Sequence, residues 1–211
     1  VLFQVELESD VQAPLYPMAL NCRGTQVACC MEKIKAVSLR DVATGEEAHK
    51  LTGPFEGQLA GVSYSADGKL VLVFGDWGTK VYDAASGSLV HSFVDKTAGD
   101  GTGTTVFHSA VAGELFVCTG NPGTAFAKDL SSGENLQALD RSTHTGGCCF
   151  DDAGERMAYF LCGRTPDGKL DMMHNGEVVL CDAKDGCREV RRITVPDVGY
   201  APILDFSPGA G

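Results

Sequence analysis

The chain has 211 residues, of which 44% are hydrophobic and 21% charged, a composition typical of a folded globular protein. Its formal net charge of -11 and the lack of a basic run argue against direct nucleic-acid binding, because that affinity comes mainly from lysines and arginines that meet phosphates. No apolar run approaches the ~20 residues of a membrane span, so membrane insertion is not expected.

The first predicted strand covers residues 1–8, in which apolar and polar side chains alternate. The next strand is expected to start near Met18. The interval between the two resembles the connection from the last strand of one repeat unit to the first strand of the next. Residues 1–8 are therefore interpreted as an edge strand that belongs to a preceding unit.

Four similar units follow, over about residues 18–51, 59–93, 105–139 and 147–193. Each contains a five-residue segment that starts with Asp and ends with Gly, between two short apolar runs. The Asp side chain can accept hydrogen bonds from backbone amides two residues further on, and Gly can adopt a positive φ. Each segment therefore predicts a tight turn between two antiparallel strands. The turn residues are Asp41 and Gly45, Asp83 and Gly87, Asp129 and Gly133, and Asp182 and Gly186.

The first half of each unit predicts a second hairpin. Its turn contains Asp67 and Gly68 in the second unit, and Gly24, Gly113 or Gly154 in the others. Each unit thus carries four strands in a meander, and successive turn aspartates are 42, 46 and 53 residues apart. A period of about 40–45 residues is that of a four-stranded propeller blade. The sequence therefore predicts an all-β fold, a β-propeller of four-stranded antiparallel blades.

Residues 202–208 predict the first strand of one further unit, which gives about four blades and a partial blade. Two interpretations of this arrangement remain open. In one, the chain is part of a larger propeller. In the other, its blades close the ring with material from a partner. Propellers typically contain 4–8 blades, which is compatible with both.

The second unit resembles a WD40 repeat. Ser65-Ala66-Asp67-Gly68 matches the turn early in such a repeat, and Tyr82-Asp83 stands in place of the Trp-Asp dipeptide. Asp76 falls where the family has an aspartate in a tight turn. The Gly-His dipeptide that opens a WD40 repeat is missing from all four units. The resemblance therefore implies a divergent WD40-like propeller over residues 1–211, whose blades depend on apolar packing rather than on the family's buried hydrogen-bond tetrad.

One end of the meander is expected to carry the binding residues. The two longest connections, residues 94–106 and 164–176, emerge at the end that also holds the turns between second and third strands. Loops on a rigid scaffold commonly carry binding residues. The predicted partner-binding residues at this end are Trp77, Arg141, His144, Arg164, Lys169, Met172, Met173 and His174.

The sequence predicts a non-catalytic protein–protein interaction scaffold, a propeller subunit of a larger assembly, with other protein subunits as partners and no cofactor. No Gly-x-Ser-x-Gly elbow is present, and the histidines follow no repeat-related catalytic pattern. Two alternatives remain. One is a reader of a peptide or modified protein tail, in which Phe55 and Tyr200 complete an aromatic wall with Trp77. The other is a propeller enzyme with a site in the central channel.

The nine cysteines are interpreted as buried free thiols on strands. Such thiols imply a reducing compartment, the cytoplasm or the nucleus. No CxxC motif occurs, and no histidine lies at zinc-like spacing from the adjacent pairs Cys29-Cys30 and Cys148-Cys149. The sequence therefore predicts no metal site, with zinc binding by these pairs as the alternative.

Overall fold

The computed structural model describes residues 18–31, 35–53, 55, 59–93, 105–121, 124–138, 145–151, 153–164, 167, 170–196, 204 and 206. Within them the chain forms strands and turns and no helix. The first two groups of strands are β1 (Met18–Leu20), β2 (Gln26–Met31), β3 (Ala36–Asp41) and β4 (Glu47–Thr52), then β5 (Leu59–Tyr64), β6 (Leu70–Gly75), β7 (Gly78–Asp83) and β8 (Leu89–Phe93). The next two groups are β9 (Thr105–Ala112), β10 (Leu115–Asn121), β11 (Thr124–Asp129) and β12 (Asn135–Ala138), then β13 (Thr145–Phe150), β14 (Arg156–Arg164), β15 (Leu170–Asp182) and β16 (Arg188–Pro196).

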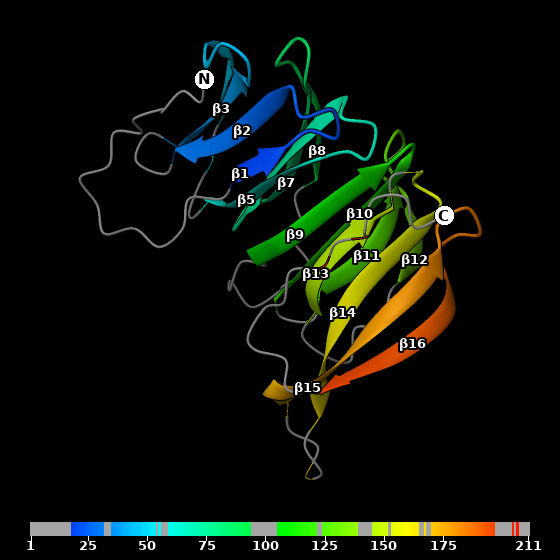
Figure 1. Cartoon of the computed structure of the whole chain (residues 1–211). Coiled ribbons are helices and arrows are strands. Elements are labelled where there is room, and N and C mark those ends of the chain that lie inside the picture. Colours follow the sequence, from blue (N-terminus) through cyan, green and yellow to red (C-terminus); the bar gives the residue numbers. More distant parts are fainter. Residues whose placement is uncertain are drawn as a thin grey trace.

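Each group of four strands makes one antiparallel sheet, in which strands that are consecutive in the chain are neighbours. The first strands of successive sheets, β1, β5, β9 and β13, lie next to one another, and the sheets follow in chain order (Figure 1). The predicted all-β class of four-stranded antiparallel meanders is confirmed. The predicted edge strand 1–8 lies outside the described residues. Of residues 202–208 only Leu204 and Phe206 are described, and neither is in a strand.

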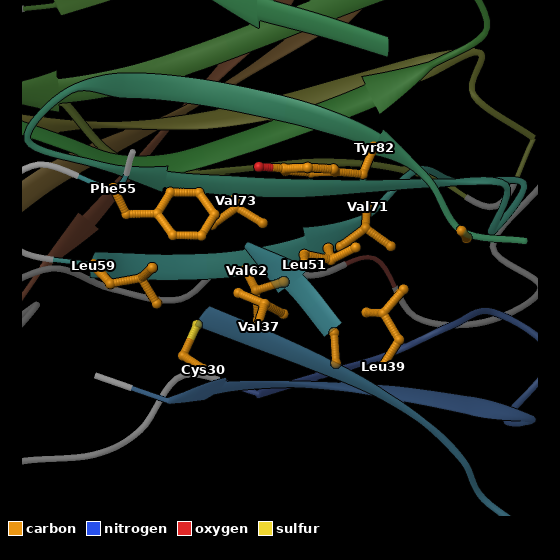
Figure 2. Packing of buried hydrophobic residues seen from close by; sticks show 12 residues of the cluster. Cys30, Val37, Leu39, Leu51, Phe55, Leu59, Val62, Val71, Val73 and Tyr82 are labelled. Atoms are coloured by element: carbon orange, nitrogen blue, oxygen red, sulfur yellow. The ribbon is translucent and has the colours of Figure 1, made fainter. Parts of the chain in front are cut away.

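The core lies between adjacent sheets, because alternate residues of each strand face the neighbouring sheet. Figure 2 shows the cluster between the first and second sheets, where Val37 and Leu39 of β3 meet Val71 and Val73 of β6. A second cluster joins the second and third sheets around Phe116, and a third joins the third and fourth sheets around Met157. Burial of one such side chain contributes about 1.5–3 kcal/mol, so these clusters hold the sheets in a fixed order.

The turns between third and fourth strands show how the repeated Asp and Gly act. The Oδ1 atom of Asp129 accepts hydrogen bonds from the Ser131 hydroxyl at 2.7 Å and the Ser132 amide at 2.7 Å. Gly133 ends this turn with a φ of +71°. Two of the other sheets have the same turn, with Asp41 and Asp83 as acceptors and Gly45 and Gly87 at positive φ. In the fourth sheet Asp182 also accepts from backbone amides, but both Gly186 and Cys187 have a positive φ, so that turn differs.

Because of the turn aspartates, the folding stability is expected to depend on pH in the acidic range. The Ser131 hydroxyl and the Ser132 amide lower the pKa of Asp129 to about 2. A carboxyl whose pKa is lower in the folded state stabilises that state above its unfolded pKa of about 3.9, and this contribution is lost as the pH falls toward 2. Asp129→Asn should therefore flatten the fall in stability between about pH 4 and pH 2, as measured by urea unfolding. Glu134→Gln is the control for net charge, and an equal flattening in both variants would contradict the prediction.

Candidate functional site

In each sheet, the turn between the first and second strands lies beside the turn between the third and fourth strands, at one end of the sheet. The Val42 amide donates to the Thr25 carbonyl oxygen at 2.9 Å, and the Ala84 amide donates to the Lys69 carbonyl oxygen at 2.8 Å. The third and fourth sheets repeat this bond, from Leu130 to Glu114 and from Ala183 to Glu155. We call this the turn end. The turns between second and third strands and the connections between sheets therefore lie at the opposite end, which we call the connection end.

The sequence-predicted binding residues are only partly described. Trp77 lies at the connection end, in the two-residue turn that Asp76 and Trp77 form between β6 and β7. Gly78 completes that turn with a φ of +107°. Arg164 is the last residue of β14, and its backbone alone is described. Arg141, His144 and Lys169 lie outside the described residues, as does Tyr200.

The insertion of the fourth unit is a strand rather than the loop expected from sequence. Met172, Met173 and His174 lie within β15, whose backbone pairs with β14 on both sides of them. Cys162 pairs with Gly176 and Gly163 pairs with Asp171, so residues 172–175 bulge out between these pairs. The strands β14 and β15 thus extend past the end of β13 as a hairpin, which we call the arm (Figure 1).

Close backbone contact fixes the base of the arm. A Cβ atom at Gly163 would lie 2.7 Å from the carbonyl oxygen of Asn175, so only glycine fits there without a shift of the backbone. The Asn175 backbone also pairs with Pro196 of β16. The bulge is therefore anchored on both sides, by β14 and by β16.

Trp77 belongs to an aromatic cluster between the first and second sheets. Its ring centroid lies 5.2 Å from that of Phe55, and Phe55 in turn lies 6.5 Å from Tyr82. The Lys80 ammonium lies 5.0 Å from the Phe55 centroid, a distance at which the ring quadrupole attracts a cation. Phe55, Lys80 and Tyr82 are buried, and burial raises the pKa of Tyr82 to about 12. The predicted aromatic pair thus exists, but a cation of the chain itself already lies against it.

Sequence reasoning missed Lys80, whose signal was a single charged residue within the apolar strand β7. Trp77 is half-buried and packs against the apolar cluster between the first two sheets. Its Nε1 atom is buried and has no hydrogen-bond acceptor in the described part of the chain. These contacts give Trp77 a packing role, whatever it also contacts outside the chain.

Replacing Trp77 by alanine is expected to lower the free energy of unfolding by about 2 kcal/mol, less than the 3–5 kcal/mol of a fully buried tryptophan. Trp77→Phe keeps a ring against Phe55 and removes an indole N–H that lacks an acceptor, so it should cost much less. Urea unfolding followed by circular dichroism measures both. Equal losses in the two variants would show that ring packing is not what Trp77 contributes.

A hollow of about 450 Å³ at the turn end lies between the first and second sheets. Its carboxylates are already bound within the chain. Asp41 and Asp83 accept hydrogen bonds of their own turns, and Asp67 pairs with the Lys69 ammonium at 3.0 Å. The hollow therefore offers no unengaged carboxylate, although the Arg23 side chain also lines it.

A smaller hollow of about 270 Å³ lies beside the first strands of the second, third and fourth sheets. Val62, Tyr64, Cys148 and Phe150 line it, with Leu204. The Tyr64 hydroxyl donates to the Oε1 atom of Gln26 at 2.9 Å, and burial raises its pKa. Burial also raises the pKa of Cys148 to about 12. Neither group is therefore ionised at neutral pH, so neither is an activated nucleophile.

Two further thiols behave in the same way. Burial raises the pKa of Cys181 to about 12 and that of Cys187 to about 11. The eight cysteines with described side chains form no disulfide, and the described residues contain no group of three or more His, Cys, Asp and Glu that could hold a metal ion. His49 joins two sheets, because its Nε2 atom lies 2.7 Å from the carbonyl oxygen of Ala85. A search of the described residues for a helix long and apolar enough to cross a membrane finds none.

No protein-family model matches the sequence, and no curated protein matches it. Solved structures do match. The β-propeller domain of Cps50 (Swd1) from Myceliophteria thermophila has a TM-score of 0.68 at 14% identity, over 90% of this chain and 58% of that one. Hydrazine synthase from Kuenenia stuttgartiensis has a TM-score of 0.63 at 13% identity, over 92% of this chain and 53% of that one. The chain therefore spans little more than half the length of these structures.

Identities this low show the fold alone. The sheet order and the likeness to a propeller domain agree that the fold is a β-propeller, as the repeats predict. One of the two similar structures is named as a propeller domain and the other as an enzyme. The fold by itself is therefore compatible with either role.

Proposed function

We propose that this chain is a non-catalytic scaffold, a propeller subunit that holds protein partners of a larger assembly at its connection end. The observation that carries this proposal is the arm. It extends the paired strands β14 and β15 past the body of the fourth sheet and presents residues 172–175 in an anchored bulge. A contact surface built on paired strands is already ordered, so less conformational entropy is lost when a partner binds.

The chemistry of the described side chains supports a binding role rather than a catalytic one. Cys148 and Cys181 have raised pKa values, the turn aspartates are bound by their own turns, and His49 joins two sheets. A nucleophile requires an adjacent base or a lowered pKa. Free thiols also support a reducing compartment, the cytoplasm or the nucleus. The partners that fit an acidic chain are other proteins rather than nucleic acid or an anionic membrane.

The arm provides the test. Residues 164–174 are replaced by a short Gly-Ser turn, and the tagged protein is purified from its own cells under mild conditions. Partners that co-purify in fixed ratio with the unaltered chain should be reduced at least about tenfold, because a contact surface is removed whole. Arg23→Ala at the turn end is the control and should keep them. Unchanged partners in the arm variant would refute the connection end as the binding surface.

The second candidate function, a reader of a peptide or modified protein tail, is supported by the Phe55–Trp77 pair at 5.2 Å. Such a reader would have to displace the Lys80 ammonium from the Phe55 ring. Trp77→Ala should then abolish peptide binding, whereas a scaffold should keep its partners. A third candidate, an enzyme with a central site, would use the hollow beside β5, β9 and β13.

A further inference from the structure

The outer strand of the fourth sheet, β16, has an edge that no other strand pairs with among the described residues. All four sheets have a register shift between their third and fourth strands. After that shift, regular pairing on β16 runs over six residues, Arg191–Pro196, but over only four residues on β4, three on β8 and two on β12. Eight of the nine residues of β16 are exposed. A long exposed edge presents backbone amides and carbonyls with which a further strand can pair.

The side chains of β16 differ between its two faces. Arg191 and Ile193 pair with Leu180 and Val178 of β15, so one face combines a cation with apolar groups. Arg192 lies on the other face, and its guanidinium binds Glu177 at 2.8 Å and Glu189 at 2.8 Å. The second face is therefore polar and internally compensated.

The charge of β16 determines which kind of partner strand is favoured. Arg188, Arg191 and Arg192 outnumber Glu189 on β16, in a chain with a net charge of -11. Arg188 is bound to Asp185 and Arg192 to two glutamates, whereas Arg191 has no ion pair in the part of the chain that the structure describes. Like charges on neighbouring strands are destabilising and opposite charges are stabilising. A second copy of β16 is thus disfavoured, and a strand with a carboxylate opposite Arg191 is favoured.

We propose that β16 binds an extended segment of a protein partner by strand addition, with an acidic side chain opposite Arg191 and apolar side chains opposite Ile193 and Val195. Backbone hydrogen bonds along the edge supply affinity, and the alternating side chains supply specificity. This surface differs from the arm, so it adds a second contact to the proposed scaffold. If β16 binds no such segment, the test of the arm is unaffected.

The probe is a synthetic peptide, acetyl-Thr-Val-Thr-Val-Thr-Glu-Thr-amide, which places Glu opposite Arg191 when it pairs antiparallel with β16. It is titrated into the 15N-labelled chain, and backbone amide shifts are followed. The amide signals of residues 191–195 should move together and their hydrogen exchange should slow. Replacing the peptide's Glu by Lys, or Arg191→Glu in the protein, should each weaken binding about tenfold. Arg23→Glu, which changes the net charge equally, should not.

The decisive measurement combines both reversals. Arg191→Glu with the Lys peptide should bind about as well as the original pair, because the opposite charges are restored with their positions exchanged. Three results would overturn the proposal. The first is no change in the amide signals of β16 at the highest soluble peptide concentration. The second is a loss of peptide binding that the exchanged pair of charges does not restore. The third is hydrogen exchange of β16 that slows without peptide as the protein concentration rises, which would mean self-association.

Discussion

Replacing Phe116 by alanine is expected to lower the free energy of unfolding by about 3–5 kcal/mol. Phe116 is 0% exposed, and its ring stacks on Phe93 at 4.5 Å between centroids with an interplanar angle of 10°. Phe93 lies on β8 and Phe116 on β10, so the stack joins the second and third sheets. The substitution removes the ring and leaves a cavity between the two sheets. Neither sheet can move on its own to fill that cavity.

Domains of this size are stable by about 5–15 kcal/mol, so the loss at Phe116 is a large fraction of the total. Urea unfolding at constant slope measures it. Phe116→Leu keeps most of the volume and should cost less than half as much. Leu136→Ala on β12 is the surface control, since Leu136 is 52% exposed, and should change stability by less than about 0.5 kcal/mol. A loss at Phe116 no larger than that at Leu136 would mean that the two sheets are not held by this stack.

Replacing Gly176 by alanine is expected to cost about 3 kcal/mol or more, the upper range for overpacking. A Cβ atom at Gly176 would overlap the ring of Phe160, which is itself buried. Gly176 lies on β15 next to the bulge of the arm, opposite Cys162 of β14. The ring must move or the two strands must part, and either change would also disturb the base of the arm.

The control for Gly176 separates overlap from backbone strain. Gly113 has a φ of +56° and open space around its Cβ position, so Gly113→Ala should cost only the roughly 1–2 kcal/mol of a left-handed residue. Phe160→Leu combined with Gly176→Ala should recover part of the loss, because the two positions share one space. Additive losses in the double variant, measured by urea unfolding, would refute the overlap.

The repeats were predictable because they are local. An Asp whose side chain binds amides two and three residues on, as Asp41 does, followed by a Gly at positive φ, determines a turn without help from the rest of the chain. Apolar runs on both sides of each turn then predict paired strands, and four copies with a similar period predict the propeller. The class of fold and the existence of two ends with different connections therefore follow from the sequence.

The candidate site was predictable only in outline. Trp77 was expected at a turn of the connection end, where it lies, but its packing against Phe55 depends on a connection more than 20 residues away in the chain. The segment around Met172 was expected in a loop because it is polar and interrupts the repeat. Its pairing with β14 arises from backbone bonds across a bulge, which polarity and spacing do not encode.

Sequence by itself thus determined the repeating unit, its turns and the acidic charge, since each depends on neighbouring residues or on composition. Only the tertiary structure decided which sheet faces bury one another and that Lys80 lies against an aromatic ring. It also decided that, within the described residues, β16 keeps a long unpaired edge and Arg191 has no ion pair. These features depend on which strands meet, and strand neighbours are fixed by burial of apolar faces over distances that a local pattern does not contain.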